Sequence, residues 1–264
     1  MSALLTQIKE NNYQLPPGAN MDEVVTQWLT FVGHPNPEIR DKLVYATFNS
    51  LLDKNAVTQP QLKHILATAL GEQHLFLGIG ENGTDTVFTR TFSALFIAGV
   101  LDMHNQSPFL SPEEIQATKA AAIKYVAQEQ DFRGYVPEKG WAHAMAHIAD
   151  VLGFLATALT NKADLTEVQE LIKVIACNPH GTYTAEEEDR LTFPAEVVIE
   201  AMTPGEAIDW LKGFNPTGKM WWDGDIPKDF YTHVNRKLFM RGLYHRLIKT
   251  GGYQEVCEFL LEKC

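Results

Sequence analysis

Two histidines and an aspartate in the stretch RGYVPEKGWAHAMAHIAD, residues 133–150, have the spacing of metal ligands. In a helix that turns about 100° per residue, His143, His147 and Asp150 fall within about 60° of one another. Two imidazoles one turn apart can reach the same divalent cation, and the carboxylate on the next turn can add a third ligand. The pattern therefore allows a metal-assisted or acid–base enzyme centred on these three residues.

A polar stripe on a helix is the competing interpretation of the same residues. Only Ala144, Met145 and Ala146 separate the two histidines, so the glutamate of the metalloprotease pattern H-E-x-x-H is absent. The apolar residues of this stretch, such as Ile148 and Leu152, lie on a different face of the helix. We therefore expect the histidines outside the core, exposed or hydrogen-bonded, and we predict no cofactor other than an optional divalent metal.

Arg90 is the second residue whose surroundings suggest chemistry. Its predicted helix, residues 86–102, is apolar on nearly every side and is therefore expected to be central and buried. A buried guanidinium needs a carboxylate partner. The candidate partners are Asp85, Asp150, Glu188 and Asp189. Arg90 then either ties two parts of the fold together or faces the groove of His143 and grips an anionic group.

The segment DFRGYVPEKGW, residues 131–141, is predicted to be a loop, because it contains Gly134, Pro137 and Gly140. Its side chains suit the rim of a groove that captures anionic or planar ligands. These candidates are Arg133, Tyr135, Lys139 and Trp141. The alternative is a rigid turn whose aromatic side chains bury against neighbouring helices.

A second acidic segment, EEEDRL, contributes Glu188 and Arg190 as further candidates for the groove. Glu188 could orient an imidazole, although an acidic first turn more often complements the helix dipole. A match to the dinucleotide fingerprint, GIGENG at residues 78–83, requires a strand–helix–strand unit, which the pattern around it does not supply. We expect these glycines to form a loop between helices.

The elements that must position these residues are helices. Apolar residues recur at i, i+3, i+4 and i+7 in most segments of the chain, and alternating strand patterns are nearly absent. Ser111 and Thr203, each followed by proline and an acidic residue, predict helix starts, and Gly251 with Gly252 predicts a helix end. The chain is predicted to be all-α.

A faint repeat suggests how the helices are arranged. A basic residue recurs near the start of longer helices at intervals of about fifty residues, in the series Arg40, Arg90, His143, Arg190 and Arg241. This period predicts an α-α superhelix of HEAT- or armadillo-like helix pairs that forms one domain over residues 1–264. Solenoids of this kind bind ligands in a concave groove.

Several blocks resemble a known family. The blocks are GIGENGTDTVFTRTFSALFIAGVL, DFRGYVPEKGWAHAMAHIADVL, EEEDRL and NRKLFMRGLYHRL. They resemble a bacterial family catalogued as a domain of unknown function (number 2785), over the chain from its first third to its end. The resemblance implies a helical protein of this length and no particular activity.

Composition limits the partners. A net charge of −11, with no large cluster of Lys and Arg, argues against nucleic acids and anionic membrane surfaces. No secretory signal is recognisable, the longest apolar run is too short to span a bilayer, and Cys177, Cys257 and Cys264 form no disulfide framework. We therefore predict a cytoplasmic binding module for a protein or small molecule. An apolar patch near Phe259, Leu260 and Leu261 suggests a homodimer as a further alternative.

Overall fold

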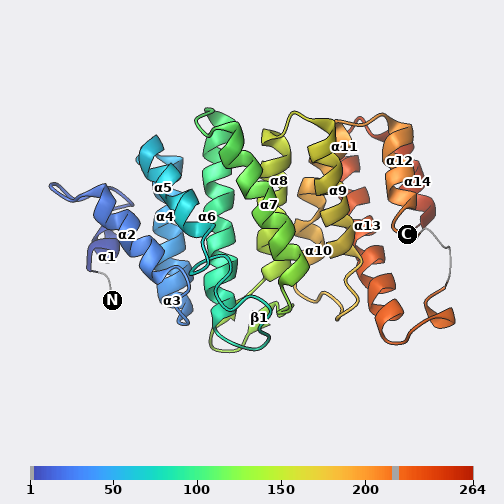
Figure 1. Ribbon diagram of the computed structural model, residues 1–264, viewed down its shortest axis with the longest axis horizontal. Helices are drawn as coiled ribbons and strands as arrows, with labels where there is room; N and C mark the ends of the chain where they lie inside the picture. The colour runs from blue at the N-terminus through green and yellow to red at the C-terminus, as the bar shows by residue number, and fades with distance from the viewer. Residues whose placement is uncertain (1–2, 216–219, 264) are drawn as a thin grey trace. The chain divides into compact units, whose positions relative to one another are not determined.

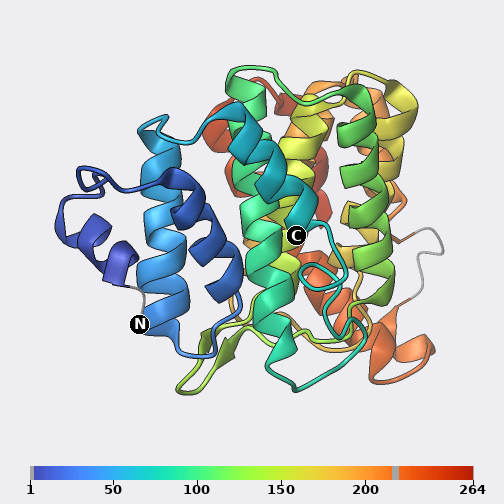
Figure 2. The same cartoon turned by 60° about the vertical axis from the view of Figure 1, so that its left-hand side comes forward.

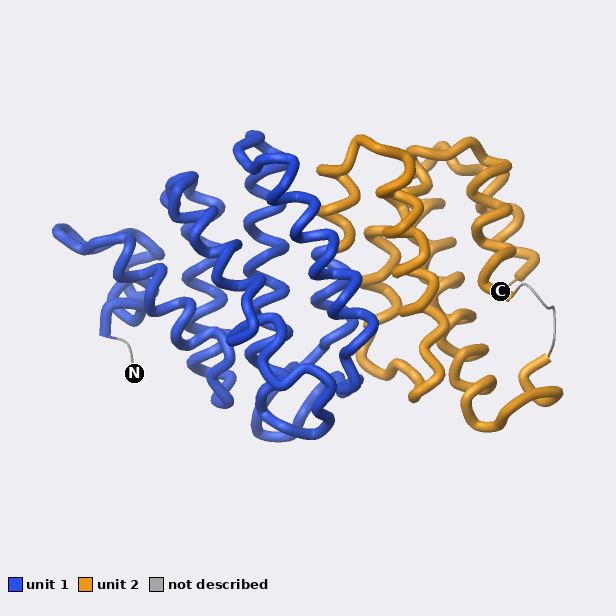
Figure 3. The backbone as a smooth tube through the Cα atoms, viewed as in Figure 1, with its two compact units in different colours: residues 1–151 blue, residues 152–264 orange. Residues whose placement is uncertain are grey.

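Helices dominate the residues that the computed structural model describes, which are 3–215 and 220–263. The strands among these residues form one short hairpin, in which β1 (Tyr135–Val136) pairs antiparallel with β2 (Gly140–Trp141). The predicted all-α class is confirmed. The backbone divides into two compact units, residues 1–151 and 152–264 (Figure 3). The assignment of residues 1–264 to one domain stays a prediction.

Unit 1 is built around helix α6. Its helices are α1 (Ala3–Glu10), α2 (Met21–Phe31), α3 (Pro37–Ile39), α4 (Ala46–Asp53), α5 (Gln59–Ala69), α6 (Thr86–Gln106) and α7 (Pro112–Gln128) (Figure 1). A π-helical segment, η1 (Arg40–Tyr45), joins α3 to α4, and α8 (Ala144–Ala158) begins in unit 1. Helix α6 packs against α4 and α5, and α2 packs against α5 and η1.

The core of unit 1 explains why α6 is apolar all round. Phe96 of α6 stacks on Phe48 of α4 at a ring-centroid distance of 4.1 Å, and Trp28 of α2 meets Phe48 edge-on at 5.4 Å. By length and composition α6 could cross a membrane, but 72% of its apolar window is buried by the rest of the protein. Its hydrophobicity is therefore that of a core helix.

Unit 2 is built around helix α13. Its elements are α9 (Lys162–Ala176), α10 (Glu187–Arg190), α11 (Thr192–Glu200), α12 (Pro204–Lys212), the short 3₁₀ turn η2 (Trp221–Asp223), α13 (Lys228–Thr250) and α14 (Gln254–Lys263). Helix α13 packs against α9, α10, α11 and α14. The fully buried Asn235 of α13 donates to the carbonyls of Asn178 and Gly181 and accepts from the amide of Tyr183. One side chain thus anchors the loop between α9 and α10.

The predicted helix boundaries at Ser111, Thr203 and Gly251 are confirmed. The hydroxyls of Ser111 and Thr203 accept hydrogen bonds from the third helical amides of α7 and α12, and each helix has proline at its first turn. Helix α13 ends at Thr250, and Gly251 follows with a φ of +84°. Cys177 and Cys257 are free thiols, and Cys264 lies outside the described residues.

The five basic residues of the predicted repeat do not occupy equivalent positions. Arg40 lies in the π-helical segment, Arg90 in the first turns of α6, His143 just before α8, Arg190 at the end of α10 and Arg241 in the interior of α13. In an all-α chain, a helix and the loop after it have similar combined lengths throughout. Regular spacing of these basic residues therefore does not show that they occupy equivalent positions in a repeat. The HEAT-like superhelix stays a prediction.

His104, near the end of α6, should make the stability of the protein depend on pH. Its Nδ1 accepts hydrogen bonds from the amides of Phe109 and Leu110, both at 3.0 Å. Burial lowers the pKa of His104 below 6.5, so the folded state disfavours the proton that would break both bonds. This contribution to stability is fully present above pH 6.5 and is lost as the pH falls through the lower pKa of the folded state.

The check is urea unfolding of the parent and of His104→Asn at pH 8 and pH 5. The asparagine carbonyl can accept the same amides without titrating. The parent should lose stability relative to His104→Asn at the lower pH. An equal difference between the two proteins at both values would contradict the assignment.

Candidate functional site

Arg90 is fully buried and forms a bidentate ion pair with Glu129. This agrees with the prediction of a buried arginine that is paired with a carboxylate. Its Nε donates to Glu129 Oε2 at 2.7 Å and its Nη2 donates to Oε1 at 3.0 Å, with both side chains at 0% exposure. Its Nη1 donates to the carbonyls of Leu77 and Gly78 and to the hydroxyl of Thr86. The partner was not among the four carboxylates proposed from the sequence. Arg90 thus holds the segment before α6 against the end of α7.

The carboxylates beside Arg90 continue this network into the following loop. Glu129 Oε1 also accepts the amides of Gln130 and Asp131, each at 2.9 Å. The buried Asp131 carboxylate accepts from the Arg133 guanidinium at 2.6–3.1 Å and from the amide of Gly83 at 3.0 Å. Arg133 in turn donates to the carbonyl of Thr84 at 2.8 Å, and its hydrogen bonds to Asp131 raise its pKa. Residues 83–84 and 129–133 are therefore fastened to each other.

Arg40 is a second buried guanidinium at the same end of unit 1. Its Nε lies 2.8 Å from Asp41 Oδ1, its Nη1 donates to the carbonyl of His34, and its Nη2 donates to the carbonyl of Lys139 at 2.7 Å. Its guanidinium carbon lies 4.2 Å from the centre of the Phe88 ring. Burial lowers the pKa of Arg40 and raises that of Asp41. The sequence marks Arg40 only as a member of the predicted repeat, although an arginine next to an aspartate, Arg40–Asp41, in a predicted helix is a signal for a buried ion pair.

The segment predicted as a loop contains the β1–β2 hairpin, which Arg40 holds in place. Gly140, with a φ of +82°, passes so close that a Cβ there would lie 3.0 Å from Pro37 Cβ and 3.1 Å from Arg40 Nη2. Lys139 pairs with both carboxylate oxygens of Asp85 at 2.7 Å. The predicted inter-helix loop at residues 78–83 is confirmed as well. Figures 1 and 2 show this hairpin and the loop at the end of unit 1 where α6 begins.

Aromatic rings form a row from the surface of the hairpin to the core of unit 1. Tyr135 and Trp141 are cross-strand partners with ring centroids 5.0 Å apart, and they are 59% and 42% exposed. Trp141 stacks on His143 at 4.3 Å, and His143 meets His147 edge-on at 5.7 Å. His147 contacts Phe92 of α6 at 5.3 Å. The outer end of the row is open to solvent and the inner end is fixed by the core.

We call residues 77–86 and 129–143 the loop platform. The charges of its cationic residues Arg133 and Lys139 are balanced by Asp131 and Asp85. Two further carboxylates, Glu81 and Glu138, are exposed. Hydrogen bonds from Thr86 and Thr84 lower the pKa of Glu81, which keeps it ionised. The platform therefore presents two aromatic rings in a surface with an excess of negative charge.

The predicted position of the histidines on one helix is wrong for His143. Helix α8 begins at Ala144, and His143 precedes it with a φ of +52°. The prediction left His147 either exposed or hydrogen-bonded. It is 5% exposed and the helix residues around it are buried, so the exposed alternative is wrong. The amides of Ala142 and His143 donate to the carbonyls of Gly134 and Arg133, which continue the pairing of the hairpin. This pairing, and not the geometry of a helix, determines where His143 lies.

The metal site proposed at His143, His147 and Asp150 gains no support from the geometry. In residues 3–215 and 220–263, no group of three or more His, Cys, Asp and Glu side chains is arranged to hold a metal ion. The divalent metal, and with it the metal-assisted enzyme, stays a prediction from the sequence.

Glu188 and Arg190 lie in unit 2, on helix α10. Glu188 is half-buried, and burial raises its pKa. Its buried Oε2 accepts no hydrogen bond from the part of the chain that the structure describes. That Glu188 and Arg190 share a groove with Arg90 and His143 stays a prediction.

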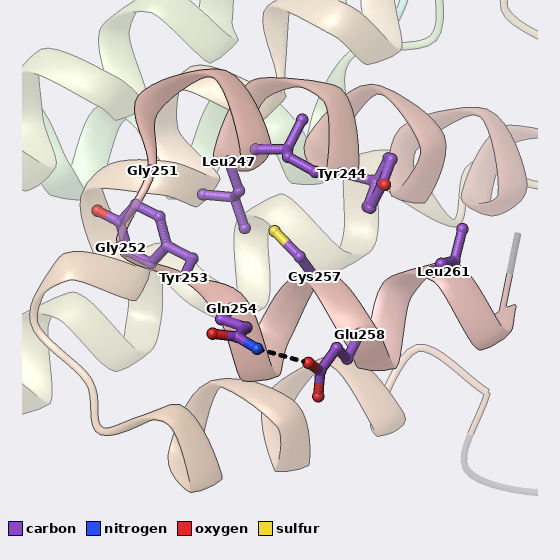
Figure 4. A pocket seen from close by; sticks show the side chains of 10 residues that line it. Tyr244, Leu247, Gly251, Gly252, Tyr253, Gln254, Cys257, Glu258 and Leu261 are labelled. Carbon is purple, nitrogen blue, oxygen red and sulfur yellow. Dashed lines mark hydrogen bonds between the residues drawn. The ribbon is translucent and has the colours of Figure 1, made fainter.

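Unit 2 carries an apolar pocket of about 290 Å³ between α13 and α14 (Figure 4). Its lining includes Tyr244, Ile248, Tyr253, Cys257 and Leu261, of which Ile248 and Leu261 are 54% and 63% exposed. The apolar patch predicted at the end of the chain therefore exists in part, but its Leu260 is fully buried. The homodimer that the patch suggested stays a prediction, which the solution mass of the protein would test.

Comparison with known proteins identifies a family and no activity. A family model described as a protein of unknown function (DUF2785) matches residues 75–245. No curated protein and no solved structure is significantly similar to the chain. The matched residues include Arg90, Glu129, Arg133, Tyr135 and Trp141, and thus nearly the whole network of the loop platform. The match covers more than half of the sequence, and the chain belongs to the DUF2785 family.

Proposed function

We propose that this chain is a binding module and that its loop platform recognises a cationic segment of a protein partner. The observation that carries the proposal is the pair of exposed rings, Tyr135 and Trp141, on loops that buried ion pairs hold in place. Loops on a rigid scaffold are where binding residues concentrate. Tryptophan and tyrosine are the residues most enriched at the energetic centres of interfaces.

The buried ion pairs give the platform the order that a recognition surface needs. A buried pair such as Arg90–Glu129 adds little net stability compared with apolar residues of the same volume. It does fix the geometry of the backbone groups bonded to it, here the carbonyls of Leu77 and Gly78 and the amides of Gln130 and Asp131. A surface that is already ordered loses less conformational entropy when a partner binds.

The charges of the platform favour a cation over an anion. Arg133 and Lys139, which the sequence suggested as anion-binding groups, each pair with a carboxylate. The exposed Glu81 and Glu138 then give the surface its net charge, in a chain with a total of −11. A lysine or arginine of a partner can lie over the face of Trp141, the ring that binds cations best, and be steered by these carboxylates.

Short Gly/Ser peptides with a central Arg-Arg, Lys-Lys, Glu-Glu or Leu-Leu pair test this proposal by surface plasmon resonance on the immobilised chain. The Arg-Arg and Lys-Lys peptides should bind most tightly. Loss of a contact of about 1 kcal/mol should make Trp141→Ala weaken that binding about fivefold.

The matched control is Trp222→Ala, which removes a 54% exposed tryptophan of unit 2. It should leave the affinity unchanged. Tighter binding of the Glu-Glu or Leu-Leu peptides, or an equal loss in the two tryptophan variants, would refute a cation-binding platform.

We propose that this protein is located in the cytoplasm. We also propose that its helices stack in a single domain. The acidic composition and the burial of α6 inside unit 1 support a protein that works in water. Cell fractionation with an antibody to the chain would test the location.

A further inference from the structure

A second pocket in unit 2 differs from the loop platform in charge. It has a volume of about 290 Å³ and lies where α12, α13 and α14 meet. Its lining comprises Leu211, Lys212, Asn215, Arg236, Met240, Phe259 and Lys263. Three of these seven residues are cations and none is acidic, although the chain has 33 acidic residues and only 22 basic ones. We call this cavity the basic pocket.

Arg236 differs from the other arginines whose partners are described above. Arg40, Arg90 and Arg133 each pair with a carboxylate, and so does Arg246 of unit 2, with Glu196. The half-buried Arg236 contacts no carboxylate among residues 3–215 and 220–263. Its polar contacts are the Phe214 carbonyl, which accepts from Nη1 at 3.4 Å, and His233 Nδ1, 3.3 Å from Nη2. Both distances are long for charge-assisted bonds, so the guanidinium keeps donors for a ligand.

The two lysines can turn toward the same ligand. Lys212 pairs with Asp209 on the surface, where both side chains are more than half exposed, and such a pair contributes little stability. The Lys263 ammonium lies 5.7 Å from the centre of the Phe259 ring. The three cations come from three different helices and line one cavity. Like charges repel, so an oxyanion bound among them would be favoured electrostatically.

The apolar residues of the lining indicate which kind of group the ligand carries beside its oxyanion. Leu211, Met240 and the ring of Phe259 make up the rest of the wall with Asn215. A volume of about 290 Å³ is at the lower end of the range for small-molecule sites. We propose that the basic pocket binds a small organic oxyanion, a carboxylate or phosphate monoester on a compact apolar body. Arg236 holds the oxyanion, Lys212 and Lys263 add charge, and Phe259 with Met240 contacts the apolar body.

Calorimetric titration of the full chain tests this site with phenyl phosphate, benzoate and inorganic phosphate. Phenyl phosphate or benzoate should bind with a dissociation constant on the order of 1 mM or lower, in a salt-dependent way. The better of the two identifies the oxyanion. Inorganic phosphate should bind at least tenfold more weakly, because it lacks the apolar body. Equal affinity for inorganic phosphate, or no binding of either aromatic anion, would overturn the proposal.

Variants locate the binding. Arg236→Gln should weaken the preferred aromatic anion about tenfold, whereas Lys237→Gln, its neighbour outside the lining, should change the affinity less than twofold. If Arg236→Gln fails to fold, the exposed Lys212→Gln and Lys263→Gln double variant serves instead and should weaken binding by a similar factor. Unchanged affinity in the variants would place the anion elsewhere and refute the site. None of these residues belongs to the loop platform, so either site can fail without the other.

Discussion

Replacing Glu129 by alanine is expected to lower the free energy of unfolding by about 3–5 kcal/mol, because it leaves the guanidinium of Arg90 buried without its carboxylate. Arg90 cannot reach water to solvate its charge, since it is fully buried. The amides of Gln130 and Asp131 also lose their acceptor. Urea unfolding at neutral pH measures the loss.

The exposed pair Lys124–Glu72 provides the control for this effect. Its two side chains are 43% and 72% exposed, and its ammonium–carboxylate distance of 2.9 Å is similar to that of Arg90–Glu129. Glu72→Ala should cost about 1 kcal/mol or less. If Glu129→Ala cost no more than Glu72→Ala, the buried pair would not hold the platform together.

Replacing Gly140 by alanine is expected to be the most damaging single-methyl change in the hairpin, at about 2–4 kcal/mol. Two costs combine there. The φ of +82° strains any residue with a Cβ, and that Cβ would press on Pro37 and on the guanidinium of Arg40. Arg40 cannot move away easily, because it is fully buried among Phe88, Phe92 and three carbonyls. Thermal and urea unfolding of Gly140→Ala measures the sum.

Gly18 separates the two costs, since it has the same φ of +82° with nothing within 4 Å of the added Cβ. Gly18→Ala therefore reports the backbone strain alone, about 1–2 kcal/mol. Gly140→Ala should exceed it by at least about 1 kcal/mol, the share of the close contact. Identical losses would show that the hairpin has room to move away from Arg40.

Much of the fold could be predicted because its signals are local. The spacing of apolar residues gave the helices, and Ser111 and Thr203 marked where two of them begin. The apolar surroundings of Arg90 correctly implied a buried, paired arginine. They could not identify Glu129, because that pairing joins residues 39 positions apart, and Glu129 follows the last turn of α7 with nothing in the local sequence to set it apart. Long-range partners depend on packing that a periodic pattern does not describe.

The histidine segment shows where a helical wheel fails. The wheel assumed that His143 and His147 share a helix, but the hairpin fixes His143 one residue ahead of α8. The alanines around His147 are small enough to let neighbouring elements pack closely, so the helix is buried on nearly all sides at His147. The same hairpin exposes Tyr135 and Trp141. Their predicted place at the rim of a ligand groove stays a prediction.

Native-state hydrogen exchange is the measurement that tests most directly whether the loop platform is a preformed surface. The amides of Gly83, Asp131, Ala142 and His143 lie outside regular helices, but each donates to a carboxylate or carbonyl of the network. They should exchange orders of magnitude more slowly than unprotected loop amides, and Glu129→Ala should speed those of Gly83 and Asp131. Exchange of all four at the unprotected rate in the parent would mean that the platform is not ordered in advance, and would contradict the account of its function.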